Sequence, residues 1–400
     1  MLYNYFTEKL IGLQGIILKN IIEKKNKIEI YIELRRKAQD CPCCGAATRT
    51  IHDYRTQVIK DIPAFGKHIA IILRKRRYKC TCGKRFAEQN EFLPRYHRMT
   101  NRLVAHVIDK LRDERSFSSV AREVDLSIST TIRIFDLVEY PKGDLSSVLS
   151  IDEFKGNTNA EKYQCILTDP ANRIVLDILS TRYSYYLSNY FKGSNKQDVN
   201  FFVSDMWRPY SDIASTYFKN AVFIVDKYHW IRQVIWAFEA IRKQEQIKFA
   251  KSHRIYFKRS KSLLIKRLNY LTDEQKQQVN VMLYASPTLS TAHFLKEYFM
   301  EILDCKDGKT AKSAMADWIE NAQDCGIDQF KKCAKTMTNW KSGILNSFDH
   351  PYTNGFTEGC NNKIKVLKRN AYGYRNFNRF RNRILHMFSH MKENKTSVAA

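Results

Sequence analysis

The sequence predicts a multidomain α+β protein, and three observations support that fold class. Two cysteine pairs lie close together in the first quarter of the chain, which is typical of a small metal-stabilised domain. Short apolar stretches separated by turns fill 148–225 and indicate β-strands. Long polar–apolar helical periodicity follows over 237–345. A chain of 400 residues, 44% of them hydrophobic, is long enough for two to four domains with their own cores.

The chain carries a large positive charge, with 67 Lys and Arg against 41 Asp and Glu and a formal net charge of +26. Such an excess calls for a polyanionic partner, of which nucleic acid is the commonest and a membrane surface the second. The first apolar stretch, Ile11–Leu18, is far shorter than the ~20 residues of a membrane span, and no signal peptide is recognisable. We therefore expect a cytoplasmic protein without a membrane partner, whose ten cysteines are thiols and metal ligands rather than disulfides.

The first two segments are a lead and a cysteine-rich region. Residues 1–37 are expected to form a short helix followed by a strand over Ile28–Leu34, and 38–98 contain the cysteine pairs. Four thiolates around one ion make a closed structural zinc site, and a glycine after each pair lets the backbone turn back toward the metal. We therefore predict that 38–98 form a zinc ribbon that binds Zn²⁺ through four ligands: Cys41, Cys44, Cys80 and Cys82.

Two features of the cysteine-rich region leave alternatives open. Cys43 stands beside the first two ligands and could replace one of them, and four buried or free thiols would give the same spacing. The strand expected to lead to the second pair carries a basic run. Its side chains either contact phosphates of a nucleic acid or form a solvated strand face; they are Arg74, Arg76 and Arg77.

Residues 99–145 have the pattern of a helix-turn-helix. A helical stretch over 117–124 is followed by a turn that begins at Asp125, and Ser127 is a natural N-cap for a second helix over 128–138. Glycine is common at this turn, whereas an aspartate adopts the left-handed conformation less readily. The alternative is an ordinary helical hairpin between domains. If the second helix enters a major groove, three side chains are expected to face DNA: Ser129, Thr130 and Arg133.

Residues 146–236 hold two candidate catalytic acids. A first strand is expected to end at Asp152, two more strands complete a meander, and a fourth strand ends at Asp205 before a helix and a fifth strand. This order is that of an RNase H-like domain, in which the first and fourth strands lie side by side. Neighbouring carboxylates repel unless a hard cation lies between them, and oxygen ligands select Mg²⁺ or Mn²⁺. For a single aspartate after a strand, the commoner role is a turn or helix cap.

A third carboxylate has to come from elsewhere in the chain. Within 346–392, expected to open with turns and end in a basic helix, Glu358 is followed by no acid through Leu385. Such a glutamate could be an ion-pair partner or a residue favoured by the helix macrodipole. One acid before a basic tail also suits a site that binds metal and follows a phosphate backbone. The expected backbone contacts are Lys363, Lys365, Lys368, Arg369 and Arg375.

Seven strings of this sequence together resemble one known family. They are Cys41–Gly45, Arg76–Cys80, Ser150–Phe154, Ser204–Trp207, Asn354–Glu358, Asn361–Lys365 and Arg369–Phe377. They resemble transposases of the bacterial ISL3 insertion-sequence family, and the likeness runs from about residue 38 to residue 388. The C-terminal strings are the most specific part of it.

The resemblance implies an aspartate–aspartate–glutamate (DDE) triad on an RNase H-like fold. Carried onto this sequence, the triad is Asp152, Asp205 and Glu358. Asp226 and His229 are similar to an Asp-x-x-His signature of several transposase superfamilies. The role of His229 stays open between positioning a DNA phosphate, bracing the site, and an ordinary buried histidine.

The resemblance also implies an all-α insertion between the two parts of the catalytic core. This insertion accounts for the helical periodicity over 237–345, and it leaves 393–400 as a C-terminal tail. The insertion either binds DNA or braces the catalytic glutamate.

The implied reaction is metal-dependent cleavage and joining of DNA strands. Two Mg²⁺ ions about 3.5–4 Å apart activate a nucleophile and stabilise the leaving oxygen of an in-line displacement. Water would nick the transposon end, and the freed 3′-hydroxyl would then attack target DNA. Asp152 would bridge both ions, with Asp205 and Glu358 each binding one. The expected partner is double-stranded DNA, bound by a homodimer in the nucleoid, because two transposon ends have to be brought together.

Two other functions stay open at this point. One is a DNA-binding regulator derived from a transposase, whose mark would be a missing acid, although all three acids are present. The other is an RNase H-like nuclease without strand transfer, which would seldom need a zinc ribbon and a helix-turn-helix as well.

Overall fold

The structure is a computed structural model that describes residues 9, 11–93 and 97–396. Most of the expected helical lead, 1–8 and 10, and the end of the expected tail, 397–400, lie outside the described residues. The chain forms two compact units. Unit 1 comprises residues up to Tyr140 with 366–373 and 382–390, and unit 2 comprises 141–365 with 374–381 and the remaining C-terminal residues. Each unit is described by itself below.

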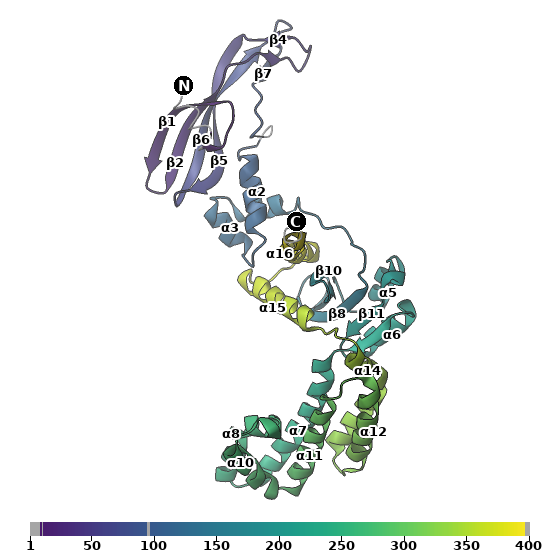
Figure 1. The fold of residues 1–400 in the computed structure, drawn as a ribbon. Coiled ribbons are helices and arrows are strands. Elements are labelled where there is room, and N and C mark those ends of the chain that lie inside the picture. Colours follow the sequence, from purple (N-terminus) through teal and green to yellow (C-terminus); the bar gives the residue numbers. More distant parts are fainter. Residues whose placement is uncertain (1–8, 10, 94–96, 397–400) are drawn as a thin grey trace. The chain divides into compact units, whose positions relative to one another are not determined.

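Unit 1 contains a five-stranded sheet (Figure 1). Its strands are β1 (Ile16–Lys24), β2 (Lys27–Leu34), β5 (Ile51–Ala64), β6 (Lys67–Lys79) and β7 (Arg85–Ala87), in the order β1-β2-β6-β5 with β7 on β6. A separate pair of short strands, β3 (Gln39–Asp40) and β4 (Ala47–Thr48), flanks the first cysteine pair, and the second cysteine pair lies between β6 and β7. The strands expected over Ile28–Leu34 and before Cys80 are confirmed as β2 and β6.

The N-terminal segment is not an independent lead. Ile16–Lys24, between the expected short helix and the expected strand, form β1, a strand that the sequence reading did not indicate although the stretch is rich in β-branched isoleucine. Strand β2 pairs in parallel with β6, with Lys27 opposite His68 at one end of the pairing and Ile32 opposite Leu73 at the other. The lead and the ribbon therefore share one sheet and one apolar core, which includes Ile32 and Ile71.

Three helices follow the sheet: α2 (Asn101–Lys110), α3 (Phe117–Glu123) and α4 (Ile128–Phe135). The predicted N-cap is confirmed, because the Ser127 hydroxyl accepts a hydrogen bond from the amide of Thr130 at 3.1 Å. Helix α4 ends at Phe135, three residues before the predicted Val138. Asp125 adopts φ = 53°, so it takes the left-handed conformation that glycine usually supplies, and its carboxylate pairs with Lys60 at 2.8 Å.

The C-terminal helices α15 (Gly355–Asn370) and α16 (Phe377–Thr396) contribute residues to both units. Within unit 1, Arg383 of α16 is fully buried and donates to the carbonyl oxygens of Leu111, Asp113 and Arg115, just beyond the end of α2. A cation placed there also offsets the negative end of the helix dipole. Arg383 therefore fastens α16 to the three-helix segment, a role that its place in a basic run did not indicate.

Unit 2 is built on a mixed sheet in the order β10-β9-β8-β11-β12. The strands are β8 (Val148–Lys155), β9 (Tyr163–Asp169), β10 (Ile174–Leu179), β11 (Phe201–Ser204) and β12 (Val222–Val225). The meander and the adjacency of the first and fourth strands are confirmed, since β8 pairs antiparallel with β9 and parallel with β11. One face of the sheet packs Leu149 and Ile151 against α5 (Ser184–Lys192) and α6 (Arg208–Tyr217). A single turn of 3₁₀ helix, Lys196–Asp198, precedes β11.

The chain between β12 and α15 is helical, and its helices gather around α7 (Figure 1). They are α7 (Lys227–Lys248), α8 (Lys251–Arg259), α9 (Lys261–Ile265), a short 3₁₀ turn (Leu268–Tyr270), α10 (Asp273–Tyr284), α11 (Pro287–Ile302), α12 (Gly308–Asp324), α13 (Asp328–Asn339) and α14 (Lys341–Asp349). Their core is continuous and includes Trp230, Phe299 and Trp318. The helical segment expected over 237–345 thus begins ten residues earlier, directly after β12.

Candidate functional site

The four predicted cysteines of unit 1 converge. The Sγ atoms of Cys41 and Cys82 lie 3.6 Å apart, those of Cys44 and Cys80 lie 3.5 Å apart, and all four lie within 4.8 Å of one another. A tetrahedral site with Zn–S distances of ~2.3 Å has sulfur atoms about 3.8 Å apart, so the cluster has the right size for one zinc ion. Cys43 is exposed and does not belong to this cluster.

The four clustered thiols differ in pKa, which is lowered for Cys41 and Cys80 and raised for Cys44 and, to about 12, for Cys82. The amide of Cys82 donates to the Cys80 sulfur, which is the main reason that the pKa of the Cys80 thiol falls to about 6. Gly45 and Gly83 have φ values of 73° and 87°, so each turn uses the left-handed conformation that glycine tolerates. Thiolates are the form that binds zinc, and the local structure supplies one before the metal arrives.

In unit 2, Asp152 and Asp205 lie at neighbouring positions of adjacent strands. Val203 is opposite Ser150, and β11 ends at Ser204, so Asp205 follows the strand end beside Asp152. Strand β8 itself continues to Lys155, which means that the expectation of a strand ending at Asp152 is wrong. Asp152 lies instead in the part of β8 beyond its pairing with β11, because β11 ends at Ser204.

Burial makes the ionised form of both aspartates unfavourable when no cation is nearby. Burial raises the pKa of Asp152 to about 6, and the charge of Asp205 adds to the rise while His229 opposes it. Burial also raises the pKa of Asp205, with Glu153 and Asp226 adding to the rise and His229 opposing it. A hard cation would remove this penalty, and an all-oxygen donor set fits Mg²⁺ or Mn²⁺.

The helix that carries Glu358, α15, docks on the sheet face opposite α5 and α6 through a buried polar chain. The Ser150 hydroxyl donates to Asn354 Oδ1 at 2.6 Å, Ser150 and Thr357 hydroxyls lie 2.8 Å apart, and Thr357 and Thr168 hydroxyls lie 2.7 Å apart. Each hydroxyl has one proton, so Thr357 donates to Ser150 and Thr168 donates to Thr357. All four side chains are fully buried. These bonds fix the first turn of α15, which contains Glu358.

The next turn of α15 contacts Asp152 directly. Asn361 Nδ2 donates to Asp152 Oδ2 at 2.8 Å, and Asn361 is 5% exposed. The spacing of the helix contacts nearly equals the spacing of the strand contacts. Four residues along a helix rise ~6 Å, and two residues along a strand rise ~6.6 Å. The helix pair Thr357 and Asn361 therefore lies along the strand pair Ser150 and Asp152. Sequence reasoning assigned no role to Asn361, although polar residues at positions 354, 357 and 361 of one helix are a signal that could have indicated a buried polar stripe.

Asp226 and His229 complete the surroundings of Glu358. Asp226 Oδ1 accepts the backbone amide of Asn354 at 2.8 Å, which anchors the start of α15 to the end of β12. His229 Nε2 lies 3.8 Å from Glu358 Oε1, and this buried nitrogen has no hydrogen-bond partner among the described residues. One possible ligand atom from each of Asp226, His229 and Glu358 lies within 4.8 Å of the others.

The predicted triad thus occupies one region of unit 2 without forming one compact ligand group in the described residues. Asp152 and Asp205 are adjacent through their strands, Glu358 is grouped with Asp226 and His229, and His229 influences the pKa of both aspartates. The sequence indicated all five residues but not that Glu358 would be closest to the accessory pair.

Candidate phosphate contacts fall into different environments. Arg76 is 5% exposed and bonds Glu33, Glu88 and the carbonyl oxygen of Leu34, so the expected DNA contact is wrong for this residue because its charge is used inside the sheet. Arg74 is exposed and ion-paired with Glu33, while Arg77 is half-buried and paired with Asp53.

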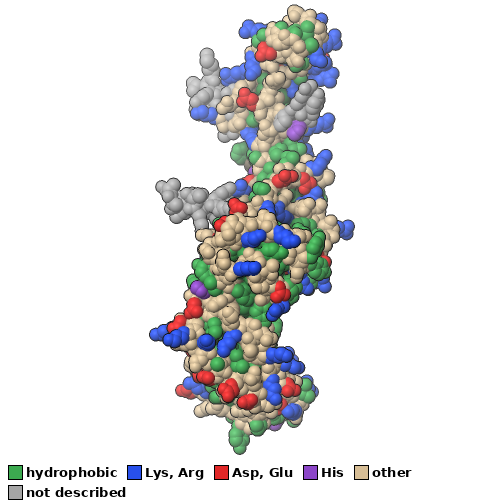
Figure 2. Space-filling model, turned by 90° about the vertical axis from the view of Figure 1, so that its right-hand side faces the viewer, with side chains coloured by type: hydrophobic (Ala, Val, Ile, Leu, Met, Phe, Trp, Pro, Cys, Tyr) green, Lys and Arg blue, Asp and Glu red, His purple; other side chains and the backbone are tan. Residues whose placement is uncertain are grey.

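The other candidates lie on helix surfaces. Ser129 and Arg133 are exposed on α4 and Thr130 is half-buried, as expected of a helix with one free face. Lys363, Lys365 and Arg375 are exposed in unit 2, whereas the exposed Arg369 and half-buried Lys368 belong to unit 1. Figure 2 shows Lys and Arg side chains over much of the face drawn, with fewer Asp and Glu.

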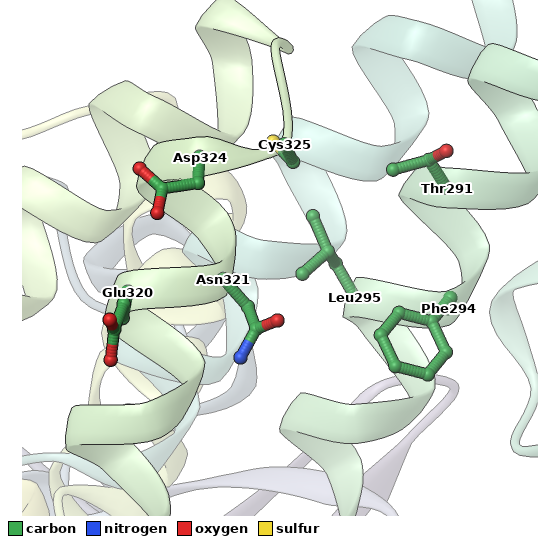
Figure 3. A pocket seen from close by; sticks show the side chains of 7 residues that line it. All are labelled: Thr291, Phe294, Leu295, Glu320, Asn321, Asp324 and Cys325. Carbon is green, nitrogen blue, oxygen red and sulfur yellow. The ribbon is translucent and has the colours of Figure 1, made fainter.

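A pocket of about 450 Å³ lies elsewhere, between α11 and α12. Figure 3 shows Thr291, Phe294 and Leu295 on one helix facing Glu320, Asn321 and Asp324 on the other. None of the candidate catalytic residues lines it. No described helix of the chain is both long and apolar enough to cross a membrane.

Three family models match the chain over the segments described above. A family model of the DDE type described as transposase matches residues 149–384, more than half of the chain. A second, described as the zinc finger of transposase IS204/IS1001/IS1096/IS1165, matches 37–82. A third, the helix-turn-helix domain of transposase family ISL3, matches 88–138. Together they define a DNA transposase with zinc-binding, DNA-binding and catalytic parts.

The chain belongs to the ISL3 family of insertion-sequence transposases. It is 27% identical over 393 residues to the transposase for insertion sequence element IS1001 from Bordetella parapertussis, covering 94% of this chain and 96% of that protein. It is 32% identical over 105 residues to the transposase for IS1557 from Mycobacterium tuberculosis, covering 26% of this chain and 23% of that one. A match of similar length, 31% over 107 residues, is to a Lactococcus lactis protein named ATP-dependent protease, covering 27% of this chain and 33% of that protein.

The Asn361–Asp152 hydrogen bond gives a specific prediction. Replacing Asn361 with Ala removes the group that orients Asp152, and loss of such a supporting bond typically costs 10–100-fold in metal affinity or activity. We expect Asn361→Ala to need more Mg²⁺ for half-maximal cleavage of an end duplex, with partial rescue at high Mg²⁺. The matched control is Asn362→Ala, an exposed neighbour on the same helix, which should behave like the wild type. Equal Mg²⁺ requirements for wild type and Asn361→Ala would contradict the prediction.

Proposed function

We propose that this transposase cuts transposon ends and joins them to target DNA with Asp152, Asp205 and Glu358 as its catalytic carboxylates. The observation that carries the proposal is the docking of α15 on β8. Thr357 and Asn361 bond the strand that holds Asp152, so the helix that carries Glu358 is fixed to that strand, whose neighbour β11 leads to Asp205. The strand order β10-β9-β8-β11-β12 supports an RNase H-like core interrupted by the helical segment α7–α14.

The domain organisation that we propose keeps the order expected from the sequence and changes the bounds of two parts. The zinc ribbon of 38–98 extends to include β1 and β2, because these strands complete its sheet. The helix-turn-helix lies in 99–145, the catalytic core in 146–236 and 346–392, and the insertion expected over 237–345 corresponds to the helices α7–α14, which begin at Lys227 and end at Asp349.

We assign the accessory pair to positioning. Asp226 holds the start of α15 through the amide of Asn354, and its side chain is buried. His229 faces Glu358 and opposes the rise that burial causes in the pKa of both candidate aspartates, which favours their charged, metal-binding form. Both residues act through the acids rather than on DNA itself.

Mg²⁺ or Mn²⁺ is the cofactor that the oxygen donors fit, in addition to structural Zn²⁺ at the cysteine cluster. When bound, such ions lower the pKa of an attacking water or hydroxyl and stabilise the leaving oxygen. The protein holds the carboxylates rigidly, because their strand and helix are joined by buried hydrogen bonds. Asp152, Asp205 and Glu358 are the residues that would hold the divalent metal.

The proposed partner is double-stranded DNA. Ser129, Thr130 and Arg133 on α4 suit base or backbone contacts in a major groove. In unit 2 the exposed Lys363, Lys365 and Arg375 suit a phosphate backbone, and in unit 1 Lys368 and the exposed Arg369 do so as well. Arg74 and Arg77 suit phosphates if DNA competes with their carboxylate partners. Two ends have to be processed together, so we propose that the active form on DNA is a homodimer.

The test uses the full-length protein and a labelled duplex of the terminal sequence that borders the gene. With Mg²⁺ we expect nicked strands, and with added target plasmid we expect joined products. Binding without nicking would favour a regulator that has lost chemistry. Nicking without joining would favour a nuclease, and either result would overturn the proposed reaction.

A further inference from the structure

Helix α7 presents a row of aromatic and cationic side chains to solvent. Tyr228, Arg232 and Trp236 are spaced by four residues, so they lie on one side of the helix. The rings are 54% and 51% exposed, and the Arg232 guanidinium lies 5.5 Å from the Tyr228 centroid and 4.2 Å from the Trp236 centroid. The other four tryptophans of the chain, all within the described residues, are buried or half-buried.

This row is not part of the helical core. The opposite side of α7 supplies the core with Trp230, Val234, Phe238 and Ile241, all of them buried. The row is held in place by its own cation–π contacts, so two π-faces are displayed without being covered. A lysine or glutamate would be the ordinary residue at such exposed helix positions.

The row begins beside the candidate catalytic site. Tyr228 is next to His229, their rings meet edge to face with centroids 5.6 Å apart, and His229 lies 3.8 Å from Glu358. From Tyr228 to Trp236 the helix rises ~12 Å. DNA advances ~3.4 Å per base along one strand, so the row spans the first few nucleotides beside the cut.

The charge of α7 favours a polyanion over another protein surface. Its two acidic residues are buried and paired, Glu239 with Arg242 and Lys261, and Glu245 with Lys248. The exposed side therefore offers cations and rings without a free acid. A DNA strand, as a polyanion, would be attracted to this side of the helix.

We propose that Tyr228, Arg232 and Trp236 form a stacking platform for an unpaired base of the strand being cut, extruded from the duplex near the transposon end. Aromatic rings bind bases through stacking, which is tolerant of sequence, and an arginine between them adds attraction to the backbone. The inference rests on the proposed function, because it places the cut strand along α7. It adds that the enzyme opens the duplex beside the cut.

The test measures binding without chemistry, using full-length protein with Ca²⁺ in place of Mg²⁺. Two terminal-sequence duplexes are compared by fluorescence anisotropy, one fully paired and one with two mismatched pairs beside the cut. We expect the mismatched duplex to bind tighter to wild type, because the cost of unpairing is already met. Trp236→Ala should weaken binding to it about 10–100-fold, as expected for losing one base stack, and Trp236→Phe should restore most of the loss.

A chemical probe and a control complete the experiment. Permanganate should oxidise a thymine beside the cut in the wild-type complex, and Trp236→Ala should change its reactivity. Tyr284→Ala removes another exposed ring of the helical segment, 94% exposed, and should change nothing. Equal binding of the two duplexes by wild type and Trp236→Ala would overturn the platform. A change in oligomeric state of Trp236→Ala without DNA would overturn it in favour of a protein interface. Failure of the catalytic proposal would instead appear as absent nicking with Mg²⁺ while these binding differences persist.

Discussion

Replacing any one of Asp152, Asp205 and Glu358 with its amide is expected to abolish strand cleavage while leaving binding to the transposon end nearly unchanged. The amide keeps the size of the side chain but removes the charge that a divalent cation requires. Loss of a metal-stabilised transition state is worth several kcal/mol, so we expect the cleavage rate to fall about 1,000-fold or more. Single-turnover cleavage of a labelled end duplex measures the rate, and anisotropy measures binding.

A matched control separates this effect from a general loss of negative charge. Asp273 is an exposed acid at the start of α10, and Asp273→Asn should cleave like the wild type. His229→Ala is informative as well: a positioning residue should cost less than Glu358→Gln. If His229→Ala and Asp226→Asn were as damaging as Glu358→Gln while Asp205→Asn remained active, the accessory group would be the real ligand set.

Removal of zinc is expected to unfold the part of unit 1 that carries the cysteines. Structural zinc sites contribute ~10 kcal/mol or more to folding, which exceeds what a few short strands supply. Cys80→Ser or a strong chelator should therefore lower zinc content from one ion per chain to near zero and greatly reduce the melting temperature of this unit. Metal analysis and thermal unfolding by circular dichroism measure both.

The exposed Cys43 supplies the control for zinc. Because it lies outside the four-sulfur cluster, Cys43→Ser should keep one zinc ion per chain and an unchanged melting temperature. Loss of zinc in Cys43→Ser, with retention in Cys44→Ser, would show that Cys43 is the ligand and would contradict the cluster described here.

The parts of the fold set by local patterns could be predicted from the sequence. Turn residues and apolar runs indicated where the strands of unit 2 lie along the chain, and Ser127 indicated where α4 begins. The spatial order of those strands came instead from the likeness to an RNase H-like domain. Long-range pairings could not be predicted in this way. The parallel pairing of β2 with β6 depends on residues about forty positions apart, and so does the ion pair between the buried Arg76 and Glu33. A run of basic residues in the sequence does not show which of them forms an ion pair with a buried acidic residue.

The candidate site likewise combines features that local sequence patterns indicate with contacts between distant residues, which they do not. The candidate acids were chosen from local patterns: Asp205 follows a strand as expected, Asp152 lies within β8 instead of at its end, and Glu358 belongs to a distinctive C-terminal string. The hydrogen bond from Asn361 to Asp152 could not be recognised in this way, because it depends on how a helix lies along a strand more than two hundred residues away in sequence. The proximity of Glu358 to His229 has the same origin.

The hydroxyl chain under α15 also constrains how this family can diverge. The hydrogen bonds of this chain all run in one direction, from Thr168 through Thr357 and Ser150 to Asn354. Replacing any single member leaves a buried polar neighbour without its hydrogen-bond partner, at a cost of ~1–3 kcal/mol in folding free energy. Replacing partners jointly by apolar groups of the same shape would cost far less. Evolutionary drift at these four positions should therefore be concerted, with related sequences changing them as a set and intermediates rarely surviving.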